Sequence, residues 1–240
     1  MFSIVIPAYN EEKYIAKCIE SVKAAEKRVD GSVEIIVVAN RCTDNTAAVA
    51  QEHGAKVIVS GDYGIAKARN AGAAQATGEI LVTLDADSLM HPDALAEVRK
   101  RLESGKFIGG GTLSKFDRKS LGITVSTLVV AKHLISTFKK HGVLLGLMFW
   151  CYKKDFDEIG GFNESLLSLE DMDFAIRLKD YGKSKGKKYG NLKKQYALTS
   201  SRKFDEFGDW YLFKNRDLVR RIFNGKDKEA VDGFYYDIRK

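Results

Sequence analysis

Short apolar runs alternate with amphipathic stretches along the first hundred residues. Four of the runs are bounded by turn residues and have the length of buried strands rather than of helices. They are Ser3–Ile6, Val33–Val38, Lys56–Ser60 and Ile80–Leu84. After the first run, apolar residues recur at i, i+3, i+4 and i+7 from Ile15 to Val22, which predicts a helix. Strands that alternate with helices in short units predict an α/β fold with a Rossmann-like, mostly parallel sheet.

Capping residues and prolines mark where further helices begin and end. Thr43 or Asp44 is suited to cap a helix that Gly54 ends. Residues 64–76 form the next predicted helix, and Pro92, in a first helical turn, opens another. Each of these helices would follow a strand of the parallel sheet.

The middle of the chain is strongly apolar, but charged residues interrupt it. Residues 121–150 contain no uninterrupted run of about 18 apolar residues, so no membrane span is expected there. The first half of this stretch predicts an amphipathic helix, and Leu147–Tyr152 predicts a strand. A further helix is expected from Glu170. The six lysines and two glycines of Lys183–Lys194 predict an exposed loop or hairpin.

The segment after Asp205 is rich in aromatic residues and predicts a helical extension. One helical face would carry Leu212, Val219, Ile222 and Phe223. A helix of this kind can pack on the domain, join two copies of the chain, or lie on a membrane surface. The sequence leaves these three alternatives open.

The positive charge of the chain belongs to its C-terminal quarter. The 240 residues carry a net charge of +7. Residues 176–240 hold 18 Lys and Arg against 9 Asp and Glu, whereas residues 1–175 hold 21 against 23. This quarter would face an anionic partner, such as a phospholipid surface or a phosphorylated acceptor, or would be a solvated basic face. No recognised nucleic-acid-binding motif accompanies it, so no nucleic-acid partner is expected.

Three widely spaced cysteines, Cys18, Cys42 and Cys151, fit neither a disulfide framework nor a zinc cluster. They favour a reducing compartment. The apolar start at residues 2–6 is too short for a signal peptide and runs straight into Pro7. A cytoplasmic protein is therefore expected.

Two carboxylates follow the fourth predicted strand. Asp85 and Asp87 lie at its carboxyl end, where open α/β sheets bind their ligands. Side chains separated by one residue point to the same side of an extended chain, and two close carboxylates repel each other. A divalent cation, Mg or Mn, would relieve the repulsion. In the alternative, structural interpretation, Asp85 caps the strand end, and Asp87 or Ser88 caps the next helix.

The phosphate-binding motifs of other nucleotide enzymes are absent from the sequence. The first strand-to-helix turn, Pro7–Glu12, contains no G-x-G-x-x-G, and the chain contains no G-x-x-x-x-G-K-[ST]. Gly109–Gly111 precedes no clear helix start. An NAD-dependent or P-loop enzyme is therefore disfavoured.

Five sequence motifs occur in an order that resembles glycosyltransferase family 2. They are S-I-V-I-P-A-Y-N-E-E, A-N-R-C-T-D-N-T, G-I-A-K-A-R-N-A-G, L-D-A-D and G-G-F-N-E-S-L-L-S-L-E-D-M-D-F. The resemblance covers about residues 2–182 and implies a GT-A fold with a nucleotide-sugar site. It also implies that Asp85 and Asp87 hold Mn or Mg against the donor diphosphate.

The same resemblance implies the residues that bind the donor. Pro7, Tyr9 and Glu11 would line the nucleotide site, and Asn40 and Asp44 would occupy the second turn. Family members often have an aspartate at the position of Asn40. An asparagine carboxamide can accept from N3–H of uracil and donate to a ring carbonyl, which favours a UDP-sugar.

Basic residues complete the donor site that the resemblance implies. Lys67 and Arg69 would reach towards the base and the diphosphate, and Arg69 is better suited because a guanidinium pairs with phosphate or stacks on a base. The alternative for both is a solvated helix face.

Some family members supply a third metal ligand from a histidine after the E-D motif, but no histidine follows Glu170 here. Arg202, in the run Ser200–Lys203, would contact the diphosphate instead.

Two neighbouring acids, Glu170 and Asp171, are the expected catalytic residues. The resemblance implies that Asp171 is the general base that takes the proton of an acceptor hydroxyl, and direct displacement of this kind inverts the anomeric configuration. Glu170 would orient the acceptor or share this role. In the structural alternative, both acids only stabilise the dipole of the helix that they open.

The sequence is therefore interpreted as an inverting, divalent-metal-dependent glycosyltransferase. It would move a sugar from a nucleotide-sugar, with a UDP-sugar favoured, to a hydroxyl of a sugar, lipid-linked or small-molecule acceptor. Residues 1–204 would form the catalytic domain, with a nucleotide-binding half to about residue 112 and an acceptor half over 113–204, and residues 205–240 a helical extension. The alternatives are a silent nucleotide-sugar-binding or scaffold protein and a sugar-phosphate nucleotidyltransferase. A homodimer and a peripheral contact with an anionic membrane stay open.

Overall fold

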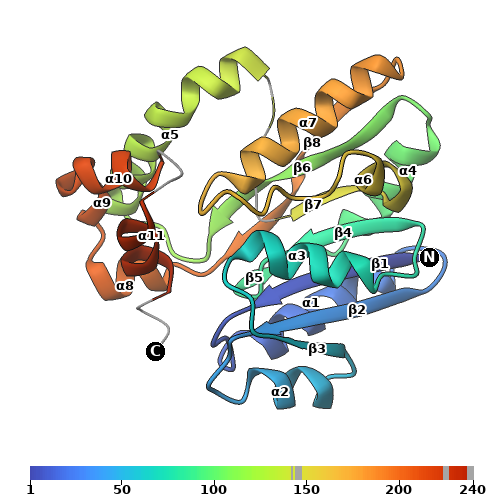
Figure 1. Cartoon of the computed structure of the whole chain (residues 1–240), viewed down its shortest axis with the longest axis horizontal. Helices are drawn as coiled ribbons and strands as arrows, with labels where there is room; N and C mark the ends of the chain where they lie inside the picture. The colour runs from blue at the N-terminus through green and yellow to red at the C-terminus, as the bar shows by residue number, and fades with distance from the viewer. Residues whose placement is uncertain (142, 144–147, 224–226, 237–240) are drawn as a thin grey trace.

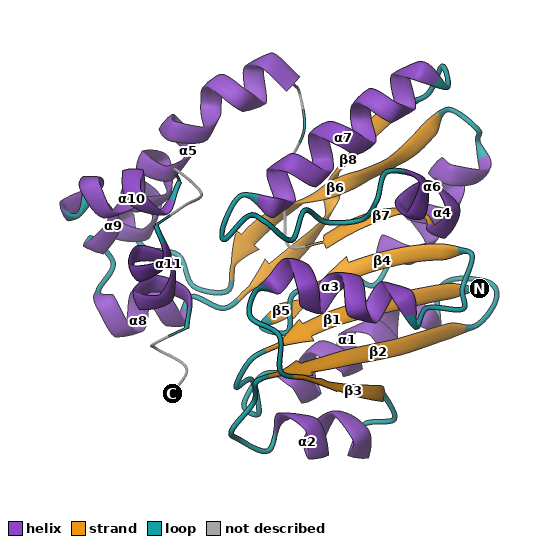
Figure 2. Ribbon diagram, in the orientation of Figure 1, coloured by secondary structure: helices purple, strands orange, loops and turns teal. Residues whose placement is uncertain are grey.

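A computed structural model of the chain describes residues 1–141, 143, 148–223 and 227–236. Its centre is one eight-stranded sheet with the strand order β3-β2-β1-β4-β7-β6-β8-β5 (Figure 1). Helices cover both faces of this sheet (Figure 2). The strands are β1 (Phe2–Ala8), β2 (Val33–Asn40), β3 (Lys56–Ser60), β4 (Ile80–Leu84), β5 (Ser88–Leu89), β6 (Phe107–Phe116), β7 (Met148–Tyr152) and β8 (Lys188–Thr199).

The first four strands form the parallel half of the sheet that the sequence predicts. In this half β1 pairs in parallel with both β2 and β4, and β2 pairs in parallel with β3. Four helices connect these strands or follow them, namely α1 (Ile15–Glu26), α2 (Thr46–Glu52), α3 (Ile65–Ala74) and α4 (Ala94–Glu103). The prediction of a mixed α/β fold with a mostly parallel sheet is therefore confirmed.

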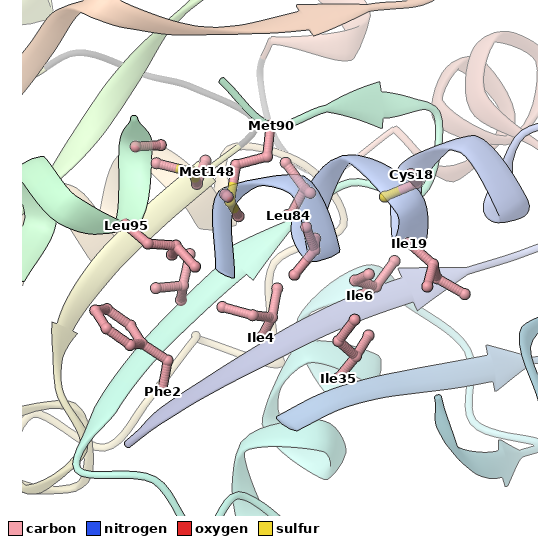
Figure 3. Close-up of a cluster of buried hydrophobic side chains, with 14 of the residues drawn as sticks. Phe2, Ile4, Ile6, Cys18, Ile19, Ile35, Leu84, Met90, Leu95 and Met148 are labelled. Carbon is pink, nitrogen blue, oxygen red and sulfur yellow. The ribbon is translucent and has the colours of Figure 1, made fainter. Parts of the chain in front are cut away.

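The largest core lies between the sheet and the helices α1 and α4 (Figure 3). Along β1 the residues Phe2, Ile4 and Ile6 enter this core, whereas Val5 enters a second core that α3 helps to form. This alternation follows from the two-residue period of a strand. Because both faces are buried, the run reads in the sequence as continuously apolar.

The second half of the sheet is less regular than the first. Strand β7 runs antiparallel to both β4 and β6. The predicted strand Leu147–Tyr152 is observed from Met148, and Leu147 lies outside the described residues. Strand β6 contains Gly109–Gly111, to which the sequence assigned no element, and it pairs in parallel with β8.

The glycines of β6 are explained by the indole of Trp150. A Cβ atom at Gly110 would lie 1.7 Å from the carbonyl oxygen of Gly190 and 2.6 Å from Cζ2 of Trp150, and one at Gly190 would lie 2.7 Å from Cη2 of the same indole. Trp150 itself is fully buried in the largest core. The glycines therefore bring two strands and a tryptophan close together, a reason for strand glycine that no local propensity reveals.

The predicted loop or hairpin over Lys183–Lys194 is wrong. Lys183 belongs to α7 (Glu170–Ser184), and β8 begins at Lys188. In β8 the side chains of Tyr189 and Leu192 are buried, while Lys193 and Lys194 are exposed. The high lysine content marks the solvent-facing positions of a strand and conceals the apolar positions between them.

The remaining helices form a module at the carboxyl end of β1, β2 and β4 (Figure 1). The module consists of α5 (Leu121–His141), α8 (Arg202–Phe207), α9 (Tyr211–Lys214), α10 (Arg216–Ile222) and α11 (Lys228–Tyr235). The short helix α6 (Lys153–Glu158) follows β7 and does not belong to it. Leu212 and Val219 are buried in a small apolar cluster of this module with Ile123 and Phe204. The extension thus packs on the domain, as one of the three alternatives expected, although α9 and α10 replace the single predicted helix.

No helix in the part of the chain that the structure describes has both the length and the apolar character needed to cross a bilayer.

Candidate functional site

A cavity of about 400 Å³ opens where the carboxyl ends of β1, β2 and β4 face the helical module. Most of the residues that the sequence singles out line this cavity. Those residues are Pro7, Tyr9, Glu11, Asn40, Arg69, Asp85, Asp87, Glu170 and Asp171. Motifs that are separated by up to 160 residues in the sequence therefore share one site, as ligand binding outside the carboxyl ends of parallel strands predicts.

The buried guanidinium of Arg69 links two of the sequence motifs. Its Nη2 donates to Oδ1 of Asp85 at 2.8 Å, and its Nη1 donates to Oε1 of Glu170 at 2.7 Å. The Arg69 side chain is only 3% exposed. Burial lowers the pKa of Arg69, but the charges of Asp85 and Glu170 outweigh burial and hold that pKa above its usual value. Arg69 therefore stays charged and is not on a solvated helix face.

A second arginine, Arg202, links the other aspartate to the first turn. It donates to both carboxylate oxygens of Glu11, at 2.5 and 2.6 Å, and its Nη2 donates to Oδ2 of Asp87 at 2.8 Å. The Glu11 side chain is 2% exposed, so this bidentate pair is well shielded from water. Arg202 begins α8, and it therefore anchors the helical module to the turn after β1 and to Asp87.

Asp171 lies in the first turn of α7, beside Glu170. Burial is the main cause that raises the pKa of Asp171 to about 7, and the negative charge of Glu170 adds to the effect. Its Oδ1 accepts a hydrogen bond from the backbone N–H of Met172 at 2.7 Å. A carboxyl group with a pKa near neutrality, lining a cavity, has the properties of a general base.

The two aspartates after β4 suit a divalent cation that also binds a substrate. Each carboxylate accepts a hydrogen bond from its arginine, and because an ionised carboxylate has about four lone-pair sites, it can coordinate a cation while it accepts such bonds. Among the residues that the structure describes, no group of three or more His, Cys, Asp or Glu side chains could hold a metal. Magnesium is commonly held by one or two carboxylates plus substrate phosphates, so Asp85 and Asp87 suit such a divalent cation.

The alternative interpretation, in which Asp87 or Ser88 caps the next helix, is wrong. Helix α4 begins at Ala94 after Asp93, and Asp87 and Ser88 cap no helix because Ser88 opens the short strand β5.

Three of the predicted donor-binding residues, Asp44, Lys67 and Arg202, do not line the cavity. Lys67 is partly exposed on α3 and lies outside it. The Asp44 carboxylate accepts from the backbone N–H of Glu12 at 3.1 Å and of Thr46 at 3.0 Å, which ties the second turn to the first. Helix α2 begins one or two residues later than predicted, with Asn45 in the capping position. Asp44 therefore has a structural contact with the turn after β1 and does not face the cavity.

Asn40 ends β2 and is almost fully buried. Its Nδ2 donates to the carbonyl oxygen of Asp62 at 2.7 Å. The hydrogen bond fixes the orientation of the carboxamide, and Asn40 lines the cavity near Tyr9.

Backbone strain collects at the same edge of the sheet. The described non-glycine residues with positive φ are Asn10 at 50°, Arg41 at 54° and Leu169 at 64°. Asn10 follows β1, Arg41 follows β2 and Leu169 precedes α7. Each residue therefore adjoins a sequence motif of the site. Such conformations persist where the surrounding structure enforces them, and they cluster at ligand-binding sites.

Sequence reasoning missed the contact between the C-terminal helix and the first turn. The ring of Tyr236 lies 5.2 Å from that of Tyr9 and 5.6 Å from that of Tyr63. The hydroxyl of Tyr63 donates to the carboxylate of Asp232 in α11. Arg41 lies over the rings of Tyr9 and Tyr63. No periodicity relates residues so far apart, so the sequence carries no signal for this contact.

The fold is of the GT-A type, and the motifs that line this site are those of a glycosyltransferase family. The model of the family described as "Glycosyl transferase family 2" matches residues 3–160, and the chain belongs to that family. The match covers the strand and turn motifs through β7 and includes α5, and it ends before α7 and the helices α8 to α11.

Individual proteins show the same relationship. An uncharacterized glycosyltransferase of Haemophilus influenzae is 29% identical over 188 residues, which cover 74% of this chain and 62% of the relative. An undecaprenyl-phosphate 4-deoxy-4-formamido-L-arabinose transferase of Serratia proteamaculans is 35% identical over 115 residues, which cover 45% of this chain and 35% of the relative. The chain thus spans between a third and two thirds of these relatives.

One similar solved structure is glucosyl-3-phosphoglycerate synthase from Mycobacterium tuberculosis in complex with Mn²⁺, UDP-glucose and phosphoglyceric acid. Its TM-score is 0.66 at 21% identity, over 96% of this chain and 79% of that one. At this identity the likeness establishes the fold.

Proposed function

We propose that this protein is an inverting glycosyltransferase that uses a UDP-sugar and a divalent cation. The observation that carries the proposal is that Asp85, Asp87 and Asp171 line one cavity together with Tyr9 and Asn40. The carboxylates for a cation, the base for an acceptor and the groups for a nucleotide are thus within one site.

Different residues of the chain would bind different parts of the donor. Asn40 presents a fixed carboxamide to the uracil, and Tyr9 presents a ring beside it. Asp85 and Asp87 hold Mn or Mg, which would neutralise the charge that develops on the leaving diphosphate. The Nε atoms of Arg69 and Arg202 are buried without a hydrogen-bond partner among the described residues, and an oxygen of the diphosphate would satisfy such a donor.

Asp171 would act on the acceptor. As a carboxylate it accepts the proton of the acceptor hydroxyl while that oxygen attacks the anomeric carbon of the donor sugar. Attack from the face opposite the leaving diphosphate inverts the configuration. Glu170, held by Arg69, orients the site around this base. The acceptor belongs to the sugar, lipid-linked or small-molecule class.

Thermal unfolding in the presence of UDP, GDP and CMP, each with and without Mn²⁺, tests the donor site. A ligand at 100 times its Kd stabilises a fold by about 2.7 kcal/mol, which corresponds to a rise in Tm of roughly 5 to 10 °C here. We expect this rise with UDP and Mn²⁺ together. Asp87→Asn should abolish it, whereas the control Asp180→Asn, on the exposed end of α7, should retain it.

Other outcomes would change the proposal in defined ways. A rise specific to GDP would keep the enzyme class and contradict the role of Asn40. No rise with any nucleotide would favour a scaffold protein that has kept the fold.

A further inference from the structure

The cavity extends beyond the polar site into the helical module, and there most of the lining side chains are apolar, with Thr127 of α5 and Lys203 of α8 as polar exceptions. Six side chains from different elements form this part, which we call the apolar chamber. They are Phe116 at the end of β6, Val130 of α5, Leu212 of α9, Val219 of α10, Phe223 directly after α10, and Phe234 of α11. The chamber is continuous with the space that Asp85, Asp87 and Asp171 line.

The chamber walls are incompletely packed. Phe116, Val130, Phe223 and Phe234 belong to the small apolar cluster of the module, yet all four are only partly buried. Side chains that border a space lose the dispersion contacts that a filled core would give them. Apolar cavities of this kind stay dry and take up apolar ligands. The packing therefore favours a hydrocarbon group as the occupant of the chamber in the complex with substrate.

The outer surface of the same helices exposes several large apolar side chains among charged ones. Within the described residues, six large apolar side chains are exposed, and four of them belong to α5 or adjoin α9: Leu121, Leu128, Trp210 and Phe213. The indole of Trp210 lies against α5, where a Cβ atom at Gly122 would come within 3.0 Å of Nε1. An amphipathic molecule held in a lipid aggregate would meet the protein at this surface, next to the chamber.

We infer that the acceptor is an amphipathic lipid whose hydrocarbon chain occupies the apolar chamber while its headgroup hydroxyl faces Asp171. This inference rests on the proposed function for the identity of the reaction, and it adds the chemical class of the acceptor. The chamber gives the helical module, of which α8 to α11 lie beyond the family match, a role at this site: it supplies the acceptor pocket.

Chain-length dependence of binding tests the inference directly. Hexyl, octyl and decyl β-glucoside serve as probes below their micelle concentrations, because each has a neutral, hydroxylated headgroup. Burial of a methylene group strengthens binding about fourfold, so decyl glucoside should bind on the order of 200-fold more tightly than hexyl glucoside. Isothermal titration on the full chain, saturated with UDP and Mn²⁺ where these bind, measures the three affinities.

Two tryptophan variants of α5 locate the binding site. Val130→Trp fills the chamber and should remove the chain-length dependence. Leu128→Trp makes the same substitution at a side chain that is 61% exposed and does not line the cavity, and it should leave the dependence intact. If Val130→Trp fails to fold, photocrosslinking of wild-type protein with a diazirine-tagged decyl glucoside replaces it, with adducts expected on α5, α10 or α11.

Three results would overturn the inference: affinities that do not depend on chain length, loss of binding in Leu128→Trp alone, or adducts confined to other elements. The UDP and Mn²⁺ shift of Tm, measured on the same preparations, separates the two proposals. A nucleotide shift without chain-length dependence removes only the lipid acceptor. Chain-length dependence without a nucleotide shift removes the donor assignment and leaves a lipid-binding chamber.

Discussion

Arg69 and Glu170 are 101 positions apart in the chain, and the guanidinium of the first donates to the carboxylate of the second across 2.7 Å. The same guanidinium donates to Asp85. One buried cation thus holds the carboxylates of two motifs at one point, and it supports both the donor side and the acceptor side of the site.

Arg69→Met should destabilise the fold strongly. The substitution leaves Asp85 and Glu170 buried, close together and without their counter-charge, and loss of one partner of a buried ion pair costs about 3–5 kcal/mol. Urea unfolding followed by circular dichroism measures the change. Lys67→Met on the same helix is the control and should stay within about 0.5 kcal/mol. Equal stability of the two variants would show that Arg69 is not needed to hold the carboxylates.

The rate should rise with pH through the pKa of Asp171. Burial raises that pKa to about 7, so the carboxyl is mostly protonated at pH 6 and cannot accept a proton, whereas at pH 8 it is mostly ionised. We expect kcat/KM to increase about tenfold between pH 6 and pH 8 with one titrating base. Asp171→Asn should lower kcat by about 10² to 10⁴ and keep the nucleotide shift of Tm. A flat pH profile in a stably folded enzyme would argue against this base.

Arg202→Ala should weaken donor binding. The buried Nε of Arg202 is proposed to donate to the diphosphate, and a hydrogen bond to a charged group contributes about 1.5–3 kcal/mol, so Kd for UDP with Mn²⁺ should rise roughly 10- to 100-fold. Arg28→Ala, which removes an exposed pair with Asp93, is the matched control. An unchanged Kd in Arg202→Ala would restrict Arg202 to its structural contact with Glu11.

Gly110→Ala should disrupt the sheet. The added Cβ atom would lie 1.7 Å from a backbone oxygen of β8, which cannot move without displacing the strand. We expect a loss of at least about 2 kcal/mol, measured as a lower urea midpoint, or a large insoluble fraction on expression. Gly61→Ala, where nothing lies within 4 Å of the new atom, should have little effect. Wild-type stability of Gly110→Ala would contradict the close packing of Trp150 over the glycines.

The sequence by itself determined the parallel half of the sheet and most of the polar residues of the site. The strands β1 and β4 are buried throughout and β2 is buried from Ile35 on, so their apolar runs are nearly continuous, and the helices that follow them keep a regular period. The aspartates after β4 could be placed at the ligand edge because all parallel strands end there. These features depend on neighbours in the chain, which a local pattern records.

Only the tertiary structure decided the rest. The glycines of β6 suit a strand because Trp150 and β8 lie against them, and the exposed lysines of β8 flank the buried Tyr189 and Leu192. Arg202 is paired with Glu11, 191 positions away, and Tyr236 covers Tyr9. The apolar chamber needs side chains from five elements and one loop residue. Each of these contacts is a match of shape or charge between distant segments, and no local spacing encodes it, because the matching partner becomes a neighbour only when the chain has folded.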